Sequence, residues 1–419
     1  MRPRDPVVVT LLWAHIVSLA GTQVSRVAIP VLAIQLLGAG PAEMGALRSV
    51  GALGLTLAFV VSGVVVDRLR PRHVMIAADL GQAALLCVIV ALCVAGLLSF
   101  GWLLGVMFGL GIHSAFFHTA QFAYVPAVVE RSELLHVNGR FEATRSIAEI
   151  AGPGISGLVL AAISPPFAIV VDAASFVVSA VLLRSIQSPD KLPDPPRPPA
   201  RPRFLTTALA GFRTVRAQPI LRSLAASATT WIFFESMLQA QLILYIERTL
   251  GLGLLALGII LAGEGIGALA GAASASRLVA RFGLGRTLVT NALRGGAATL
   301  LIPFASGPAW LVIGTLVFAE VMRGFGRPVF NICSSAIQQV VVPPSLRARV
   351  NAAMRLRFSV AAIAGPIAGV GFDLPVRALV AIACAGLLVS VCWLLRAEIR
   401  SLRDVTSLEI YDPSKESTS

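Results

Sequence analysis

The chain is short of charged residues and of cysteine. Only 13% of its 419 residues are charged, 56% are hydrophobic, and the mean hydropathy is +0.83. A soluble protein of this length needs far more polar surface to cover its cores. The five cysteines form no CxxC pair, and we expect them to be small apolar packing residues. The shortage of charge therefore excludes an ordinary soluble globular protein.

Motifs of soluble-enzyme chemistry are also missing from the sequence. It has no P-loop, no nucleophile elbow, no glycine-rich dinucleotide turn after a strand and no metal-ligand cluster. Without a P-loop, ATP is not expected to drive any step through this chain. We therefore predict that the protein is not an enzyme and that it uses no cofactor and no metal.

Long apolar runs are what the sequence has in abundance. A transmembrane helix needs ~20 consecutive, mostly apolar residues. The first run is too long, and its Arg26 comes too late, for a cleaved signal peptide. Twelve runs are long enough, at residues 8–36, 42–66, 74–97, 101–122, 141–163, 166–186, 220–246, 254–275, 286–304, 308–330, 353–372 and 376–396. They predict an all-α membrane protein with twelve transmembrane helices.

The net charge of +13 is explained by where the basic residues lie. Twenty-four of the 34 lysines and arginines fall in the termini and in alternate loops, whereas only Arg248 and Arg377 fall in the opposite loops. Cytoplasmic loops of membrane proteins carry such an excess. We therefore expect both termini to be cytoplasmic, in a bacterial inner membrane. The sequence offers no folded basic domain that would bind nucleic acid.

A proline-rich segment separates two blocks of six runs. The proline density of residues 188–202 opposes a helix and favours an extended, solvated linker. Directly after it, apolar residues recur at helical spacing from Phe204 to Val215, which predicts an amphipathic helix on the cytoplasmic leaflet. The predicted domains are an N-terminal six-helix half at 1–186, the linker with its helix at 187–219, a C-terminal six-helix half at 220–396, and a cytoplasmic tail at 397–419.

Part of the N-terminal half is repeated in the C-terminal half. Residues 137–153 align without a gap on residues 350–366, and eight of the seventeen aligned positions are identical. An offset one residue shorter places Asp79 opposite Asn291. Transporter folds are commonly built from duplicated bundles, with the substrate site where the repeats meet. The repeat therefore predicts two pseudo-symmetric six-helix bundles.

Both copies of the repeat end in a Gly-Pro pair. These pairs are Gly152-Pro153 and Gly365-Pro366. Proline removes a backbone hydrogen bond and kinks a helix, and a small neighbour lets another helix approach. The two pairs are predicted to be either paired hinges or kinks that serve only packing.

Two motifs resemble those of the major facilitator superfamily. The loop after the second run contains Gly63, Asp67, Arg68 and Arg72, whose charges can form an ion-pair latch at the membrane surface. Its pattern resembles the G-x-x-x-D-R-x-G-R-R/K loop of that superfamily, with two later positions changed. The segment 152–157 resembles the fifth-helix G-P-x-x-G-G motif of its antiporters, with Gly152, Pro153 and Gly157 matching and Ser156 in place of a glycine.

Further segments resemble one branch of the superfamily. Residues 247–258 and 347–355 are similar to the branch that contains macrolide-efflux proteins and the enterobactin exporter. The resemblance runs along most of the chain. It implies a two-bundle fold, alternating access and drug:proton antiport, but it does not identify the substrate.

Charged residues inside the apolar runs are the clearest functional signal. Each costs at least ~2.5–3.5 kcal/mol at the bilayer centre, so it should face a cavity or a partner. Glu320, Arg323 and Arg327 share one face of the tenth run. At a helical rise of ~1.5 Å per residue, Glu320 comes close to the middle of the membrane, and Glu235 and Glu264 reach a similar depth.

The resemblance narrows these charges to a set of candidate cavity and proton-coupling residues. In the superfamily, the first, fourth, seventh and tenth helices line the central cavity, which implicates Arg26, His113, Glu235, Glu320 and Arg323. The alternative is that these residues form ion pairs that only hold helices together. Because Arg323 is one turn from Glu320, we expect it to stabilise the charge of Glu320. Glu235 would then be the proton carrier.

The sequence therefore predicts a secondary active transporter that works by alternating access. It would act as a monomer in the lipid bilayer and export a drug-like or secondary-metabolite small molecule in exchange for protons. A carboxylate in a partly dry cavity favours its neutral form and can load a proton from one side. The direction of transport is implied only by the resemblance. Two alternatives stay open: an importer or facilitator of a small metabolite or lipid, and a membrane sensor or scaffold that transports nothing.

Overall fold

A computed structural model describes residues 6–130, 133–186, 204–369, 374–396, 399 and 402 of the chain. Most of the predicted linker and nearly all of the predicted tail lie outside these ranges. The described residues form thirteen α-helices and two short helices of other kinds, and they contain no β-strand.

The first six α-helices are α1 (Pro6–Leu37), α2 (Pro41–Val66), α3 (Pro71–Val94), α4 (Phe100–Val128), α5 (Leu134–Ala162) and α6 (Pro165–Ser185). The remaining helices are α7 (Phe204–Ala217), α8 (Pro219–Leu244), the π-helix η1 (Tyr245–Thr249), α9 (Leu254–Phe282), α10 (Leu284–Thr299), the 3₁₀-helix η2 (Ile302–Phe304), α11 (Ala309–Val341), α12 (Pro344–Ala368) and α13 (Val376–Leu394). Proline occupies the first position of α2, α3, α6 and α12, where a missing N–H breaks no intrahelical hydrogen bond.

The twelve helices predicted to cross the membrane are all present. Eight of them, α1, α2, α3, α4, α6, α9, α11 and α13, are long and apolar enough to do so by length and composition. α5, α8 and α12 are as long but more polar, and α10 is extended by η2. The remaining helix, α7, lies in the segment for which the sequence predicts an amphipathic helix. The predicted twelve-helix fold is therefore confirmed.

Several helices do not end where the apolar runs end. α9 continues to Phe282 and α11 to Val341, and α12 begins at Pro344, before the apolar run starts. A helix satisfies its backbone internally, so it can extend beyond the apolar part of its sequence. α10 instead stops at Thr299, and Pro303 follows within η2. Proline has no N–H to continue the hydrogen-bond ladder, which explains the early end.

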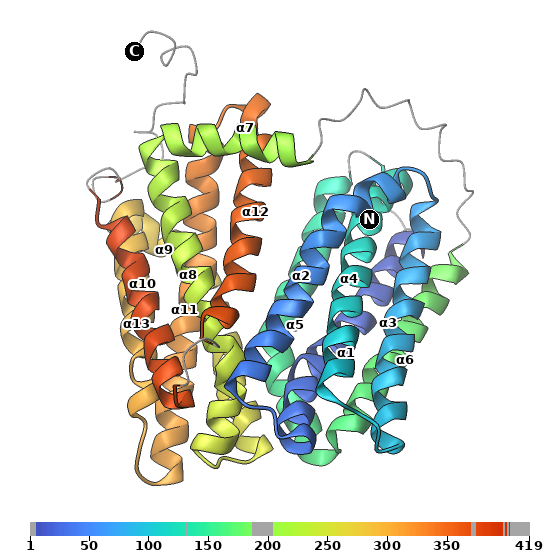
Figure 1. The fold of residues 1–419 in the computed structure, drawn as a ribbon. Coiled ribbons are helices and arrows are strands. Elements are labelled where there is room, and N and C mark those ends of the chain that lie inside the picture. The colour runs from blue at the N-terminus through green and yellow to red at the C-terminus, as the bar shows by residue number, and fades with distance from the viewer. Residues whose placement is uncertain are drawn as a thin grey trace. The chain divides into compact units, whose positions relative to one another are not determined.

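The chain folds into two compact units (Figure 1). Unit 1 comprises the described residues of 1–200 with those of 243–262, and unit 2 comprises the described residues of 201–242 and 263–419. Unit 1 therefore contains α1–α6, and unit 2 contains α7, α10–α13 and most of α8. α9 begins in unit 1 and continues in unit 2. The domain limits predicted from the sequence stay a prediction.

In unit 1 the helices pack in pairs that glycines bring close together. α1 packs on α5 and α6, α3 packs on α4 and α6, and α2 packs on α4. A Cβ atom on Gly54 of α2 would overlap the carbonyl of Phe108 on α4, and one on Gly157 of α5 would overlap the backbone of Gly258 on α9. At such points only glycine lets the two helices lie this close together.

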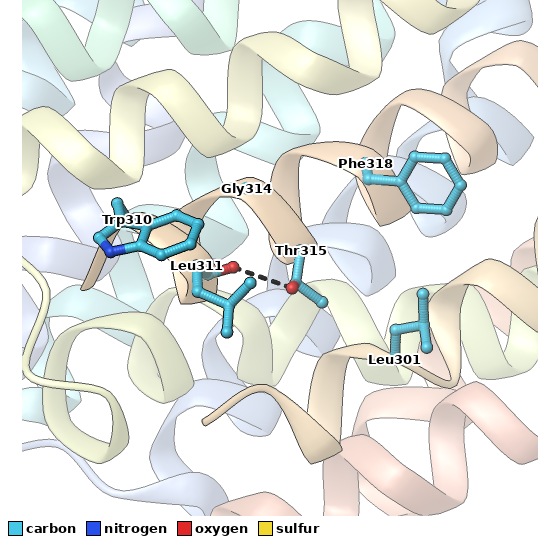
Figure 2. Close-up of a pocket in the computed structure, with 6 residues that line it drawn as sticks. All are labelled: Leu301, Trp310, Leu311, Gly314, Thr315 and Phe318. Atoms are coloured by element: carbon cyan, nitrogen blue, oxygen red, sulfur yellow. Dashed lines mark hydrogen bonds between the residues drawn. The ribbon is translucent and has the colours of Figure 1, made fainter. Parts of the chain in front are cut away.

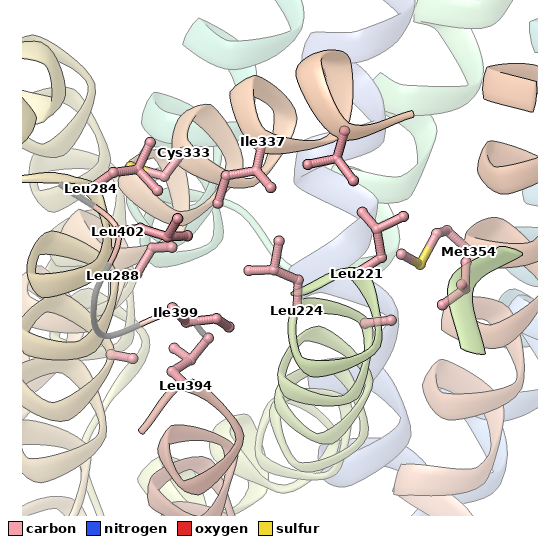
Figure 3. Packing of buried hydrophobic residues seen from close by; sticks show 14 of the residues in the cluster. Leu221, Leu224, Leu284, Leu288, Cys333, Ile337, Met354, Leu394, Ile399 and Leu402 are labelled. Atoms are coloured by element: carbon pink, nitrogen blue, oxygen red, sulfur yellow. The ribbon is translucent and has the colours of Figure 1, made fainter. Parts of the chain in front are cut away.

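Unit 2 has a continuous apolar core where α8, α10, α11 and α12 meet (Figure 3). The labelled side chains come from α8, α10, α11, α12 and α13 and from the residues after α13, namely Leu221, Leu224, Leu284, Leu288, Cys333, Ile337, Met354, Leu394, Ile399 and Leu402. Cys333 is fully buried among them, as expected for an apolar packing residue. In Figure 1, α7 runs across the end of α12.

The internal repeat is visible as the same contact in both units. In unit 1, a Cβ on Gly152 of α5 would overlap the side chain of Gln23 on α1. In unit 2, a Cβ on Gly365 of α12 would overlap Phe233 and Ser236 on α8. Gly365 lies 213 residues after Gly152, and Ser236 likewise lies 213 residues after Gln23. Each Gly-Pro pair is therefore a close-contact point between equivalent helices, whether or not it also bends during transport.

We expect Gly365→Ala to destabilise the protein by ~1–3 kcal/mol, because the new methyl group cannot fit unless the Phe233 carbonyl moves. Gly314→Ala in α11 of the same unit is the matched control. A Cβ there meets nothing within 4 Å, and alanine favours a helix over glycine by ~0.8–1 kcal/mol. Thermal unfolding of the purified variants in detergent measures both effects. Equal melting temperatures for the two variants would contradict the close contact at Gly365.

Candidate functional site

Embedded charges from three helices of unit 2 meet in one place. α8 supplies Glu235, α9 supplies Glu264, and α11 supplies Glu320, Arg323 and Arg327. We call these five residues the Arg323 cluster. The side chain of Arg323 is only 2% exposed and that of Glu320 is 0% exposed, whereas Glu235 and Glu264 are 20% and 18% exposed. The cluster thus has a buried centre and two partly accessible carboxylates.

Glycines on α9 and α11 explain why Glu264 reaches this centre. Gly263 and Gly267 of α9 face α11, and a Cβ at Gly267 would overlap the carbonyl of Val321. Gly324 of α11 faces α9 in return, since its Cβ would overlap the carbonyl of Glu264. Small residues at matching positions allow two membrane helices to approach closely. The close approach places Glu264 beside Arg323, which directly precedes Gly324.

All three nitrogens of the Arg323 guanidinium are bonded to carboxylates. Its Nη1 donates to Oε1 of Glu235 and, at 3.3 Å, to Oε1 of Glu264. Its Nη2 pairs with Oε2 of Glu320 and, at 2.8 Å, with Oε2 of Glu264, while its Nε donates to Oε1 of Glu320 at 3.3 Å. Arg323 is therefore shared among three carboxylates.

The charges of the cluster do not balance when every member is ionised. Three carboxylates face two guanidinium groups, and the second of these, on Arg327, is 56% exposed and 3.7 Å from Oε1 of Glu264. Among these five side chains taken alone, one negative charge is left over. Burying an uncompensated charge is costly, so binding of one cation or one proton would lower that cost.

The geometry corrects one premise of the sequence argument. Arg323 was expected to act on Glu320 and to leave Glu235 apart, but it binds both side chains directly. The sequence could not show this, because Glu235 lies 88 residues away on another helix. Glu235 still differs from Glu320 for another reason. Both oxygens of Glu320 are bonded to Arg323, whereas Oε2 of Glu235 is buried without a hydrogen bond to any described residue.

The candidate list omitted two members of the cluster, Glu264 and Arg327. The resemblance pointed to the first, fourth, seventh and tenth helices, and Glu264 lies on the eighth membrane helix, α9. Its depth in the apolar run was the signal that could have included it. A further polar neighbour is Gln239, whose Nε2 donates to Oε1 of Glu235 at 3.2 Å.

The two candidates in unit 1 each bond to a residue of their own helix. Arg26 of α1 is exposed, and its Nη1 donates to Oε1 of Gln23 at 3.2 Å. His113 of α4 is half-buried, and its Nδ1 donates to the carbonyl of Gly109 at 2.8 Å. A Cβ on Gly81 of α3 would overlap the His113 ring, so this ring packs at the interface of α3 and α4.

The four residues of the predicted latch lie at the end of α2 and the start of α3. The backbone N–H of Asp67 donates to the carbonyl of Gly63 at 3.0 Å, and the side chains of Asp67 and Arg68 are exposed. Arg72 instead reaches the end of α6. Its Nε donates to the carbonyl of Leu183 at 2.9 Å, and its Nη2 donates to that of Arg184 at 2.6 Å. In this structure Arg72 therefore caps a helix, and the latch role stays a prediction.

The residues of the helix-kink motif lie within continuous helices. Pro153 is half-buried inside α5, and Pro366 is buried inside α12. Ser156, which replaces a glycine of the family pattern, is buried and donates to the carbonyls of Gln23 and Gly152 at 2.8 and 2.7 Å. This hydroxyl ties α5 to α1, so the substitution adds a hydrogen bond at a contact that otherwise depends on small size.

A shallow pocket near the start of α11 has a different character (Figure 2). It is lined by Leu301, Trp310, Leu311, Gly314, Thr315 and Phe318, and the Thr315 hydroxyl is bonded to its own helix at the Leu311 carbonyl, 2.9 Å away. Trp310 is 73% exposed. No lining residue is titratable, so this apolar surface cannot perform charge coupling, and the Arg323 cluster is the better candidate site.

Replacing Arg323 should reveal how strongly the cluster depends on it. Arg323→Gln leaves three carboxylates without their shared cation, and we expect a loss of ~3–5 kcal/mol of stability. Adding Glu320→Gln should recover part of this loss. Arg327→Gln is the control, because that side chain is mostly exposed. Melting temperatures in detergent report the stability of all three variants. An Arg323→Gln variant as stable as Arg327→Gln would show that the cluster does not hold these helices together.

Comparison with known proteins identifies the family. The model of the Major Facilitator Superfamily matches residues 11–366. The multidrug efflux pump Tap of Mycolicibacterium fortuitum is 29% identical over 377 residues, covering 85% of this chain and 86% of that protein. The enterobactin exporter EntS of Escherichia coli O1:K1 / APEC is 25% identical over 344 residues, covering 81% and 78%.

Solved structures share the fold at low sequence identity. The nucleoside transporter NupG has a TM-score of 0.73 at 12% identity and covers 93% of this chain and 98% of its own. A bacterial homologue of the iron transporter ferroportin, in an inward-facing state, has a TM-score of 0.67 at 18% identity and covers 94% and 100%. Since the family model spans most of the sequence and the twelve helices match, this chain belongs to the Major Facilitator Superfamily and is a multi-pass membrane transporter.

Proposed function

We propose that this protein exports a drug-like or secondary-metabolite small molecule in exchange for protons, by alternating access. The observation that carries the proposal is the surplus carboxylate of the Arg323 cluster. A site that binds either a proton or a substrate, but not both, converts a proton gradient into exchange of the two. The relatives described as efflux pumps and exporters support the outward direction.

Glu235 is the carboxylate best suited to take up the proton. Its Oε2 makes no hydrogen bond to the described residues, so a proton can bind there without first displacing Arg323. The Glu235 side chain as a whole is partly accessible, although Oε2 itself is buried, whereas Glu320 is enclosed and holds Arg323 with both oxygens. Proton uptake at Glu235 would loosen one of the bonds to Arg323, which gives a physical link between protonation and the packing of α8 against α11.

The membrane location and the orientation of the protein are part of the same proposal. The excess of basic residues in alternate loops supports a bacterial inner membrane with both termini in the cytoplasm. The exposed charges of Asp67 and Arg68 would then lie at the cytoplasmic surface, where a latch would act. The transporter would work as a monomer and would use the proton gradient without a cofactor.

Import or facilitated diffusion of a small metabolite or lipid is the alternative within transporters. Uptake of labelled substrate into inverted vesicles separates it from export, because only an exporter coupled to protons accumulates substrate when the vesicle interior is acidic. A sensor or scaffold would show neither accumulation nor ligand-induced stabilisation. A panel of compounds tested on a deletion strain would supply the substrate for these assays.

Glu235→Gln tests the coupling role directly. The amide keeps the shape of the protonated side chain but cannot release a proton. We expect substrate binding and exchange to persist, while accumulation driven by an imposed pH gradient in inverted vesicles falls at least tenfold, to the level of passive exchange. Glu320→Gln should instead weaken binding or stability, because it removes a bidentate partner of Arg323.

Glu43→Gln is the matched control for this experiment. Glu43 accepts a hydrogen bond from the Gly40 backbone at 3.0 Å at the start of α2, far in sequence from the cluster. Its replacement should leave gradient-driven transport unchanged. If Glu235→Gln also keeps full gradient-driven accumulation, Glu235 is a packing residue and another group carries the proton.

A further inference from the structure

A second acidic side chain is buried in unit 1, where the proposed function does not use it. Asp79 of α3 is 0% exposed, and neither of its carboxyl oxygens has a hydrogen bond to a described residue. The polar group beside it is the hydroxyl of Ser179 on α6, which is also fully buried and unbonded. Two buried polar groups therefore face each other across the interface of α3 and α6.

The helices around Asp79 bring no compensating charge to it. α3 packs on α6 and α4, and among the described residues none forms an ion pair with Asp79. Three other titratable groups on these helices have partners of their own. His113 of α4 packs against Gly81 and is bonded to Gly109, Asp172 of α6 accepts from Ser175 at 3.3 Å, and Arg72 of α3 caps the end of α6.

An ionised Asp79 would be poorly compensated in this position. A buried carboxylate needs a cation or several hydrogen-bond donors, and Ser179 can supply only one donor. A neutral carboxyl group needs no cation and fewer hydrogen-bond partners. Its O–H and its C=O can each pair with a single neighbouring hydroxyl, which also satisfies Ser179.

The internal repeat supplies an independent comparison. Asp79 aligns with Asn291 of α10, at the corresponding place in the other half. There the Nδ2 of Asn291 donates to the carbonyl of Gly326 on α11 at 2.9 Å, and its Oδ1 accepts from Arg294 at 3.2 Å. Unit 2 thus uses a neutral side chain with one donating and one accepting end at this position. Only a protonated aspartic acid has both ends.

We propose that Asp79 is a second proton-binding site, located between α3 and α6 of unit 1 and separate from the Arg323 cluster. The proton resides on Asp79 in the conformation described here, and the neighbouring Ser179 hydroxyl is the group to which the protonated carboxyl can bond. The proton comes from water and leaves only when water reaches the interface of α3 and α6. This site is independent of the role of Glu235, so either assignment can fail while the other stands.

Infrared spectroscopy of the purified full-length protein tests this site without any substrate. A protonated carboxyl group has a C=O stretching band that an ionised carboxylate lacks. We expect the parent protein at neutral pH to show such a band that is lost in Asp79→Asn and kept in Glu43→Gln. An Asp79→Asn spectrum with the same band intensity as the parent would overturn the proposal, because Asp79 would then be ionised.

Ser179→Ala keeps the test decisive if Asp79→Asn does not fold. This variant leaves the carboxyl group in place and removes its partner, so the Asp79 band should persist at a higher frequency. An unchanged band position, or no protonated band, would overturn the assignment. The Glu235→Gln variant should keep the Asp79 band in full, which separates this result from the outcome of the transport assays.

Discussion

A guanidinium group without access to solvent constrains the arrangement of three helices in unit 2. Arg323 is buried in a protein whose helices are mostly apolar, and an unpaired charge there would cost more than most single packing contacts contribute. Carboxylates from α8, α9 and α11 must therefore converge on it. The same demand explains the glycines of α9 and α11, because only close backbones let Glu264 reach the centre. Charge compensation and helix packing are thus one constraint in this region.

The two units have kept the repeated contact but have diverged in their charges. Gly152 against Gln23 and Gly365 against Ser236 preserve one helix contact across both halves. The buried charges do not follow this symmetry. Unit 2 gathers three carboxylates around one arginine, whereas Asp79 in unit 1 is buried without a cation among the described residues. A duplicated scaffold of this kind can hold its shape through the shared contacts while each half carries a different set of buried charges.

The proposed alternating access requires interfaces with more than one stable packing, and the Arg323 cluster has features that suit such an interface. The guanidinium makes several bonds of unequal length to three acceptors, so losing one of them leaves the others in place. A proton at Glu235 would therefore shift the balance among these bonds without leaving Arg323 unpaired. In this way a local change of one charge can alter how α8 sits against α11 at a modest energetic cost.

The sequence alone determined the fold class, the number of helices and the presence of charged residues at mid-membrane depth. These follow from run length, hydropathy and helical rise, which are local properties. It also identified Glu235, Glu320 and Arg323, because a charge in an apolar run is conspicuous. Only the tertiary structure decided which carboxylates share Arg323, that Glu264 belongs with them, that Arg72 caps α6, and that Asp79 lacks a cation. Partners 50 or more residues apart are set by helix packing, and the periodicity of a single helix carries no information about them.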